Sequence, residues 1–504
     1  MSVADPRHGS IAILARGTLA RMSEGKDIRL IPDGRLRIAS STYDDGPILS
    51  VADRWTGEPM ARVVMADSAR ANAAISASLA AFERTRAMRS YERRDLLRRV
   101  SIALGAHKEV LATLLARESG KPITQAIGEV TRAMSTFDLA SEESTRMVGE
   151  VMPLDITPVS AFYSGGWVRQ AVGPVLAIAP FNFPLNLVAH KVAPALACGC
   201  SVVLKPPPQT PLSSLALVAI LREAGMPEDA VQVVPCDNAV AEALVKDDRF
   251  AVLSFTGSAK VGWYLKSIAG KKRVLLELGG NAAAIVHDDA NAAWAAERIV
   301  AGAFAYAGQV CIKVQRVYVH RPIADAFIAD LVTRTRAITP QNPLDPKTVL
   351  GPMIDEANAK RVESWVAEGI AAGARPLLRG TRDGAKLGPT ILEFDGDGIG
   401  TKVVDEEVFG PVLTVHRYDT WNDALRMADA TRYGLQAGIF TDSQTRIREA
   451  FARLHVGGLI VNDTPTFRVD SMPYGGVRDS GFGREGVRFA MEEMTDRKLL
   501  VFRE

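Results

Sequence analysis

The sequence predicts an α/β protein built from two doubly wound domains. From Pro174 onward, short apolar strands alternate with helices, and a second block with the same rhythm begins at Ala282. Continuous apolar strands that alternate with helices are typical of parallel sheets covered by helices on both faces. At 504 residues the chain is also longer than one hydrophobic core usually allows, which indicates two or three domains.

Composition narrows the class of protein. Hydrophobic residues make up 47% and charged residues 23% of the chain, which is normal for a globular protein. The net charge is only +2, with Lys and Arg spread along the chain, so we expect no nucleic acid partner. The longest apolar run, Val192 to Leu204, is interrupted and falls short of the ~20 residues of a membrane helix, and the first residues show no secretory signal. We therefore expect a cytoplasmic protein without a membrane partner.

The four cysteines, Cys198, Cys200, Cys236 and Cys311, do not make a disulfide framework in a chain of this length. One glycine separates Cys198 from Cys200, but no histidine or further cysteine lies near them, so core positions are favoured over a metal site. We expect no metal site in the chain. Thiols without a disulfide pattern fit a reducing compartment.

The first 172 residues are expected to hold an arm, long helices and a hairpin. Residues 1–45 mix Pro, Gly and charges and should form the arm with early strands. Leu96, Val100 and Leu104 recur every four residues, which predicts an amphipathic helix. Two strand-like segments flank a turn region, which favours a hairpin. The predicted elements are Ser68 to Ala87, Ser90 to Glu118, Ala126 to Ser141, Val151 to Asp155 and Trp167 to Val172.

In the first alternating block, Phe255-Thr256-Gly257-Ser258 follows an apolar strand and opens a helix. The amides at this helix start and the Ser258 hydroxyl are a candidate pyrophosphate site. An ordinary serine N-cap would look the same, and the block contains no G-x-G-x-x-G fingerprint. Ligands of doubly wound sheets bind beyond the carboxyl ends of the strands, so a nucleotide cofactor is expected here. The predicted strands are Val175 to Ala179, Ser201 to Leu204, Val231 to Val234 and Ala251 to Phe255. One predicted helix begins at Leu185, and two others cover Leu212 to Ala224 and Ala259 to Ile268.

The second block has the same alternation. Its predicted strands are Ala282 to Val286, Gln315 to His320, Val412 to His416 and Leu459 to Asn462, and its helices are Ala292 to Tyr306, Ile323 to Ile338, Ala357 to Ala372 and Ser443 to Leu454. Cys311 lies at the entrance of this block.

Three side chains are candidates for covalent chemistry. Cys311 follows a turn-prone stretch and could be a nucleophile, provided that donors or a base lie nearby, because a free thiol is mostly protonated at neutral pH. Asn182 ends a strand between prolines and aromatic residues, where its amide can donate to a developing oxyanion. Glu277 ends another strand beside two glycines and is a candidate base. Each has a simpler interpretation: a buried structural cysteine, a turn-forming asparagine and a surface carboxylate.

Six motifs occur in order along the two blocks. They are Pro180-Phe181-Asn182-Phe183-Pro184, Leu204-Lys205-Pro206, Phe255-Thr256-Gly257-Ser258, Glu277-Leu278-Gly279-Gly280, Gly308-Gln309-Val310-Cys311 and Glu407-Val408-Phe409-Gly410-Pro411. With this order and spacing, the chain from about residue 45 onward resembles the aldehyde dehydrogenase superfamily. The resemblance implies an aldehyde dehydrogenase-like fold and NAD(P)-dependent oxidation of an aldehyde to a carboxylic acid.

The resemblance also implies catalytic roles for the matched residues. Cys311 would be the nucleophile that forms a thiohemiacetal, and Asn182 with the Cys311 amide would hold the oxyanion. Glu277 would activate the water that hydrolyses the thioester. Lys191 matches a supporting lysine near the asparagine. Two alternatives use the same cysteine: a coenzyme A-acylating dehydrogenase, which can dispense with the base, and a thiol esterase, which needs no cofactor contacts.

Toward the cofactor, NAD or NADP, the resemblance implies contacts from two domains. Lys205 and Glu407 match ribose contacts, and Phe409 matches a support for the nicotinamide. Ser258 matches a pyrophosphate contact, and Gly257 and Val261 are the other candidate cofactor contacts. Where the family often has a glutamate that favours NAD, this chain has Pro208, so we expect NADP to be accepted.

The resemblance also implies how the chain divides into domains. Residues 1–45 form the arm, 46–150 and 172–279 the coenzyme-binding domain, and 280–484 the catalytic domain. Residues 151–171 and 485–504 would be oligomerisation elements, with a small β hairpin and a C-terminal segment that pairs across subunits. A homodimer or homotetramer is therefore expected.

Three further motifs favour a subgroup within the superfamily. They are Val188-Ala189-His190-Lys191, Gln315-Arg316-Val317-Tyr318-Val319-His320 and Met472-Pro473-Tyr474-Gly475-Gly476. They look most like the lactaldehyde, succinate-semialdehyde and non-phosphorylating glyceraldehyde-3-phosphate dehydrogenases, which implies a small polar or anionic aldehyde. Arg132 and Arg468 are candidates for pairing with its anionic group, although either could be a solvated surface arginine. The other candidate substrate contacts are Phe183, His190 and Phe467.

Overall fold

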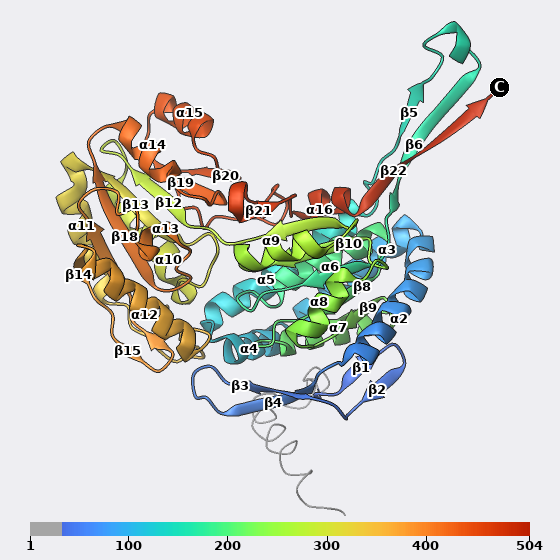
Figure 1. Ribbon diagram of the computed structural model, residues 1–504, viewed down its shortest axis with the longest axis horizontal. Helices are drawn as coiled ribbons and strands as arrows, with labels where there is room; N and C mark the ends of the chain where they lie inside the picture. Colours follow the sequence, from blue (N-terminus) through green and yellow to red (C-terminus); the bar gives the residue numbers. More distant parts are fainter. Residues whose placement is uncertain (1–32) are drawn as a thin grey trace, which may run out of the picture.

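The computed structural model describes residues 33–504, which form two α/β domains side by side (Figure 1). The other residues of the expected N-terminal arm lie outside the described part of the chain. The sheet of the first domain has six strands, in the spatial order β21 (Gly481–Phe482), β11 (Arg273–Glu277), β10 (Val252–Thr256), β7 (Val175–Ile178), β8 (Val202–Lys205) and β9 (Val231–Val233). All neighbours are parallel except β21 and β11.

Helices cover both faces of the first sheet. One face carries the largest core, enclosed by α3 (Ser90–Ala106), α4 (Lys108–Ser119), α5 (Ile123–Glu143), α6 (Asn186–Cys198), α7 (Leu212–Glu223) and α16 (Val487–Glu493). The opposite face is covered by α2 (Ser68–Ala87), α8 (Asn238–Lys246) and α9 (Ala259–Ile268). The predicted bounds of α2 and α9 are confirmed.

The helix predicted from Ser90 to Glu118 is broken at His107, where α3 ends and α4 begins. A spacing of four residues advances about 40° beyond a full turn at each step, so the apolar positions Leu96, Val100 and Leu104 drift around the helix axis. The break resets this drift and lets Leu111 of α4 face the same core, in which all four leucine and valine side chains are buried.

The second domain is also doubly wound. Its sheet has seven strands, in the order β14 (Arg375–Leu378), β17 (Thr390–Phe394), β18 (Val412–Tyr418), β13 (Val314–His320), β12 (Ala282–Val286), β19 (Gln436–Phe440) and β20 (Gly458–Val461), and only β14 is antiparallel to its neighbour. One face is covered by α10 (Ala292–Phe304), α11 (Arg321–Arg336), α12 (Glu356–Ala371) and α13 (Lys402–Asp405), and the other by α14 (Trp421–Asp429) and α15 (Gln444–Arg453). The prediction of two doubly wound domains is confirmed.

Short strands complete the described chain. They are β1 (Leu36–Ile38) with β2 (Ser41–Tyr43), β3 (Ile48–Ala52) with β4 (Pro59–Val64), and β15 (Arg382–Asp383) with β16 (Lys386–Leu387). The described helices include none with the length and apolar character needed to cross a membrane.

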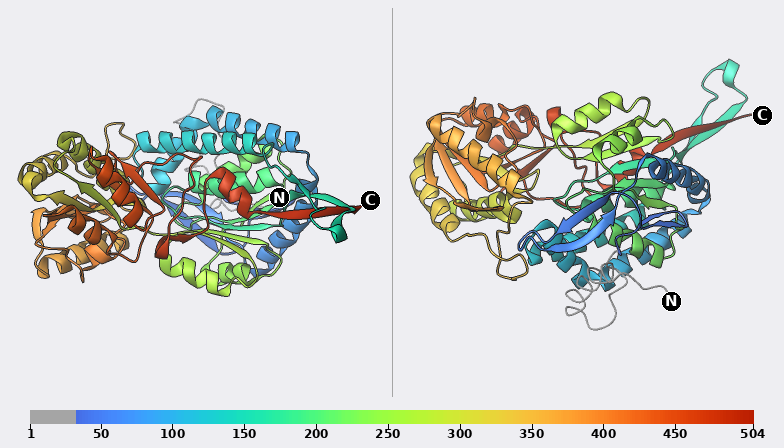
Figure 2. Two further views of the ribbon diagram at one scale, coloured as in Figure 1. Left: turned by 90° about the horizontal axis from the view of Figure 1, so that it is seen from above. Right: turned by 60° about the horizontal axis from the view of Figure 1, so that its bottom comes forward.

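A three-stranded sheet projects away from both domains (Figure 2). It contains the predicted hairpin, β5 (Glu150–Pro153) and β6 (Tyr163–Ala171), and the C-terminal strand β22 (Thr495–Arg503). β22 pairs along its whole length with β6 of its own chain and forms one edge of this sheet, so the expected pairing of the C-terminal segment across subunits stays a prediction. Apolar side chains such as Val151, which is 90% exposed, line the projecting sheet. Its role in oligomerisation stays a prediction.

The segment expected to serve oligomerisation, residues 485–504, divides between two places. Val487 and Met491 of α16 are buried in the core of the first domain, so only β22 belongs to the projecting sheet. The chain also returns to the first domain earlier than residue 485, because Gly481 pairs with Glu277 at the edge of the first sheet. This return brings a loop of the second domain to the carboxyl ends of the first sheet.

A buried ion pair positions the start of α6, the helix that follows the Asn182 motif. The Lys121 ammonium and the Glu129 carboxylate pair directly, and both side chains are fully buried. Glu129 Oε1 also accepts the Leu185 and Asn186 N–H groups, at 2.9 and 3.1 Å. These two amides at the N-terminus of α6 would otherwise lack an acceptor.

Replacing Glu129 with Ala should destabilise the fold by about 3–5 kcal/mol, because it leaves the Lys121 ammonium buried without a partner. Chemical unfolding monitored by circular dichroism measures the effect. Glu142→Ala is the control, since Glu142 pairs with Arg146 on the surface, and it should leave stability unchanged. The double variant Lys121→Met/Glu129→Ala should be more stable than Glu129→Ala alone; equal stability would contradict this explanation.

Candidate active site

A left-handed turn presents the thiol. α10 ends at Phe304, two residues earlier than predicted, because Tyr306 and Ala307 adopt positive φ angles of 50° and 53° in the short helix η2 (Ala305–Gly308). Gly308 follows with φ of 66°, and a Cβ there would lie 2.3 Å from the Gly410 carbonyl oxygen, so glycine is required. The turn places Cys311 just before β13, between the two domains.

The Cys311 thiol contacts a tyrosine. Its Sγ lies 3.2 Å from the Tyr474 hydroxyl, which comes from the loop that returns to the first domain. Burial raises the pKa of Cys311 to about 11, although the Tyr474 hydrogen bond acts in the opposite direction. The resting thiol is therefore protonated at neutral pH.

Asn182 lies against the thiol loop. Its Nδ2 donates to the Gln309 carbonyl at 3.0 Å, two residues before the cysteine, and its Oδ1 accepts the Phe183 N–H at 3.1 Å. The side chain is buried. The structure thus brings together the predicted nucleophile and the predicted amide donor, which come from different domains.

Glu277 is buried at the end of β11, so the surface interpretation is wrong for this residue. Its Oε2 has no hydrogen-bond partner among the described residues. A Cβ on Gly475 would lie 2.8 Å from Oε1, which explains a glycine at this close approach. Burial, reinforced by the charge of Glu485, holds the pKa of Glu277 well above its ordinary value. A carboxylate with a raised pKa is a stronger base.

Lys191 of α6 binds the carboxylate of Glu485, the residue whose charge raises the pKa of Glu277. Its Nζ donates to Glu485 Oε1 at 3.0 Å and to Ser254 Oγ at 3.1 Å. Burial alone would raise the pKa of Glu485, but the charges of Lys191, His190 and Arg468 outweigh it and lower the pKa to about 2. Glu485 is therefore ionised, which leaves Glu277 as the candidate for proton exchange.

The predicted substrate arginines are both near this site and are not free surface groups. Arg468 lies over the Tyr474 ring, 3.6 Å from its centroid, and its Nη2 lies 3.4 Å from Glu485 Oε2. Arg132 donates to Asp470 Oδ1 at 2.6 Å, and His190 Nε2 lies 2.8 Å from the same oxygen. The Nε atoms of Arg132 and Arg468 are buried without hydrogen-bond partners among the described residues. Each of these two guanidinium groups thus has an Nε–H that could donate to an anion.

The two aromatic candidates lie apart from this network. The Phe183 ring receives the Lys121 ammonium at 3.7 Å from its centroid and packs edge-on against Tyr306. Phe467 is 46% exposed in the loop before Arg468. Contact of either ring with a substrate remains a prediction.

The predicted cofactor residues gather at the carboxyl ends of the first sheet and at the facing edge of the second domain. Lys205 ends β8, is buried, and has no carboxylate partner among the described residues, which fits a ribose or phosphate acceptor from a ligand. Ser258 starts α9, is exposed, and makes no side-chain cap hydrogen bond. Gly257 and Val261 flank it, while Pro208 is exposed in the loop after Lys205.

From the second domain, Glu407 and Phe409 reach the same edge. Glu407 accepts the Gly280 N–H at 3.2 Å, and burial raises its pKa to about 7. Phe409 has a positive φ of 46°, and its ring packs edge-on against Phe181 with centroids 5.8 Å apart. These residues fit a nicotinamide cofactor lying between the domains, with Lys205 and Ser258 on one side and Glu407 and Phe409 on the other.

Sequence reasoning missed four contacts of the site. Tyr474 was noted only as part of a subgroup motif, and Glu485, Asp470 and Ser254 were not considered. The pair of glycines after Tyr474 is the one local signal, because glycines permit the close approach to Glu277. Nothing in the local sequence marks Asp470 or Glu485 as buried.

Known proteins share both the sequence and the fold. The profile of the aldehyde dehydrogenase family matches residues 42–500. The 3-sulfolactaldehyde dehydrogenase of Priestia aryabhattai is 42% identical over 454 residues, which cover 90% of this chain and 94% of that protein.

Two solved structures superpose with the chain over most of its length. Aldehyde dehydrogenase 21 from Physcomitrella patens, in complex with the reaction product succinate, has a TM-score of 0.90 and 43% identity, covering 93% of this chain and 98% of that one. The glyceraldehyde-3-phosphate dehydrogenase of Methanocaldococcus jannaschii, complexed with NADP, has a TM-score of 0.87 and 36% identity, covering 92% and 100%.

The partly buried thiol, the amide beside it, the candidate base and the candidate cofactor residues occur in a chain that matches one family over nearly its whole length. This chain therefore belongs to the aldehyde dehydrogenase family and is an NAD(P)-dependent oxidoreductase that acts on aldehydes.

Proposed function

We propose that the chain oxidises a small aldehyde that carries an anionic group, with Cys311 as nucleophile and Glu277 as base. The observation that carries the substrate class is the position of Arg468. Its guanidinium stacks on Tyr474, whose hydroxyl lies 3.2 Å from the thiol, and its buried Nε–H has no acceptor among the described residues. An aldehyde at the thiol thus has a cation close to its far end.

The first step forms a C–S bond. The Cys311 thiol loses its proton to a base, for which Glu277 is the candidate, and the sulfur electron pair adds to the aldehyde carbon. The carbonyl π electrons move to oxygen and give a thiohemiacetal anion. The Asn182 amide and the Cys311 N–H are the proposed donors to this oxyanion, since Asn182 already contacts the loop that carries the thiol.

A bound nicotinamide cofactor supplies the hydride acceptor that turns this adduct into a thioester. Hydrolysis then depends on Glu277, which releases the thiol proton to solvent and takes a new proton from water while the water oxygen bonds to the acyl carbon. The C–S bond breaks, the carboxylic acid leaves, and Glu277 returns its proton to the sulfur, which restores the thiol. The raised pKa of Glu277 supports this role, because it makes the carboxylate basic enough to accept the proton.

The charges around the thiol support an anionic substrate. Lys191, Arg132 and Arg468 supply three positive charges near the site. Asp470 and Glu485 supply two ionised carboxylates, because the His190 hydrogen bond and the Arg132 charge lower the pKa of Asp470, and Lys191 and Arg468 lower that of Glu485, despite burial. Burial and the charge of Glu485 raise the pKa of Glu277 and favour its neutral form, in which the cluster has one cation in excess. An anionic group would neutralise it.

The names of the relatives agree with this substrate class. One relative is named for 3-sulfolactaldehyde, whose sulfonate is an anion, and another was solved with succinate, which has a carboxylate beyond the one that oxidation creates. A guanidinium pairs well with either group through its N–H donors. We therefore place sulfonate and carboxylate aldehydes ahead of neutral ones.

Arg468→Leu should lower kcat/KM for 3-sulfolactaldehyde or succinate semialdehyde by about 10–100-fold, the range expected for a lost hydrogen bond to a charged group. For propionaldehyde, the change should stay below about threefold. Steady-state kinetics on all three aldehydes measure the ratio. Arg146→Leu, which changes a surface arginine paired with Glu142 and Glu143, should alter neither. Equal losses for charged and neutral aldehydes would rule out the anion contact.

Glu277→Gln should release one equivalent of reduced cofactor in a burst and then stall as a thioester, because an amide cannot take the proton from water. Stopped-flow absorbance and intact-protein mass spectrometry detect the burst and the acyl adduct. Cys311→Ala should give neither, whereas Cys198→Ala should turn over like the parent.

In the parent protein, deacylation should become faster as pH rises, because Glu277 must be ionised and its pKa lies above the ordinary carboxyl range.

Loss of the burst itself in Glu277→Gln would place this residue before hydride transfer. Release of the acyl group only to added coenzyme A would favour the acylating alternative.

NADP should be used with a kcat/KM within about tenfold of that for NAD, a difference below about 1.4 kcal/mol, because Pro208 supplies no carboxylate to repel a 2′-phosphate. Pro208→Glu should lower kcat/KM for NADP much more than for NAD. Both coenzymes are compared on one aldehyde. A preference of the parent for NAD beyond a hundredfold would show that another group excludes the phosphate.

A further inference from the structure

A second cluster of chemically reactive side chains lies at the far end of the second sheet. β12 ends at Val286 and β13 at His320, and because Val286 pairs with Val319, the next residues of the two strands, His287 and His320, are neighbours. Asp288 follows in the turn after β12. The ligand atoms of His287, Asp288 and His320 all lie within 4.8 Å of one another.

Hydrogen bonds assign the proton on each imidazole. Tyr418 donates its hydroxyl proton to the Val286 carbonyl at 3.2 Å, so its oxygen accepts from His287 Nδ1–H at 2.9 Å. His320 Nε2 lies 3.2 Å from the Asp419 carbonyl, which can only accept, so this nitrogen carries the proton. His287 Nε2 and His320 Nδ1 are left with bare lone pairs.

These lone pairs point into a site that holds another acceptor. Both nitrogens are buried without a hydrogen-bond partner among the described residues, and the His287 side chain is only 4% exposed. Asp288 Oδ1 lies 3.5 Å from His287 Nε2, and Oδ2 lies 3.3 Å from His320 Nδ1. Three electron-rich groups thus face one another, an arrangement that repels unless a cation lies between them.

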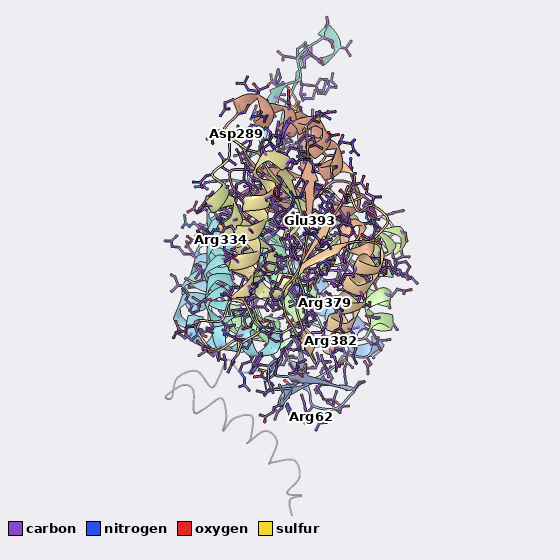
Figure 3. The ribbon with its side chains drawn as sticks, turned by 90° about the vertical axis from the view of Figure 1, so that its left-hand side faces the viewer. Arg62, Asp289, Arg334, Arg379, Arg382 and Glu393 are labelled. Atoms are coloured by element: carbon purple, nitrogen blue, oxygen red, sulfur yellow. The ribbon has the colours of Figure 1, made fainter. Side chains whose placement is uncertain are left out.

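The nearby Arg446 does not resolve this repulsion, because it is paired with another carboxylate. Arg446 is held nearby by its ion pair with Asp289, which lies in the same turn and is labelled in Figure 3. A divalent ion bound by the lone pairs themselves removes the conflict.

We propose that His287 Nε2, His320 Nδ1 and one carboxylate oxygen of Asp288 bind a divalent transition-metal ion of the zinc type. Two imidazoles and a carboxylate are a suitable ligand set for such an ion. The two imidazole nitrogens lie 3.5 and 3.3 Å from the two different oxygens of the Asp288 carboxylate, so this carboxylate reaches both rings. Asp288 is exposed, so water can complete the coordination.

The hydrogen bonds of the other two ring nitrogens are those expected around a metal site. Tyr418 and the Asp419 carbonyl fix the orientation of the two rings, as outer partners of metal-bound histidines do. His287 and His320 are also stacked, with ring centroids 4.3 Å apart. The ring positions are therefore set before an ion arrives.

The ion would stabilise the fold and would not take part in aldehyde chemistry. Cys311 lies just before the start of β13, whereas His320 ends it, so the length of a seven-residue strand, about 20 Å, separates them. The proposed ion would join the ends of β12 and β13, and the hydrogen bonds of the two rings would link it to Tyr418 and Asp419. Its presence is independent of the proposed substrate and of the catalytic steps.

Zinc binding is measured by competition with a chromophoric chelator, in full-length protein that carries Cys311→Ala so that the reactive thiol cannot bind zinc. We expect one zinc ion per chain. Asp288→Asn and His320→Ala should each weaken binding by at least about 100-fold, since each removes a ligand and not only an outer partner. His455→Ala is the matched control, because His455 pairs with a single carboxylate, Asp429, and it should bind zinc like the parent.

Thermal unfolding gives a second readout. Added zinc should raise the melting temperature of the parent and of His455→Ala but not that of Asp288→Asn, whose exposed substitution should not disturb folding. Absence of stoichiometric binding in the parent overturns the proposal. So does zinc binding that persists in both Asp288→Asn and His320→Ala.

Discussion

The active site depends on two carboxyl groups that are buried close enough to influence each other, Glu277 and Glu485. Two adjacent buried carboxylates cannot both ionise without compensation, so neighbouring cations decide which one carries the charge. Lys191 and Arg468 contact Glu485 and lower its pKa, while Glu277 keeps a raised pKa and an unpaired oxygen. This difference separates a fixed structural anion, Glu485, from the proposed base, Glu277.

The difference in pKa between Glu277 and Glu485 depends on the return of the chain from the second domain to the first. Glu277 is held at the edge of the first sheet by pairing with Gly481, and the same returning segment carries Arg468, Tyr474 and Glu485. The site therefore includes the thiol loop of one domain, the strand ends of the other and the segment that crosses between them. A ligand placed between the domains contacts all three.

The same crossing segment connects catalysis with substrate choice. The Tyr474 hydroxyl contacts the Cys311 thiol, and the Tyr474 ring contacts Arg468. A single residue therefore separates the proposed nucleophile from the proposed anion contact. Asp470 holds Arg132 and His190 from the other side. The cations are thus fixed by ionised carboxylates before a substrate arrives, which reduces the ordering that binding requires.

The sequence alone determined the secondary structure, the two-domain class and the residues in the motifs. These features are local: apolar periodicity predicts strands and helices, and Cys311, Asn182 and Glu277 stand at turns and strand ends where their chemistry can be recognised. The exceptions are also physical. The break at His107 and the left-handed turn at Tyr306 depend on packing against other elements, and the pairing of β22 with β6 depends on where the C-terminus arrives. Only the tertiary structure decided which charged groups meet. Asp470 reaches His190, Glu485 reaches Lys191, and His287 reaches His320 through strand register and chain crossing, so residues far apart in the sequence become neighbours without any periodic signal that marks them.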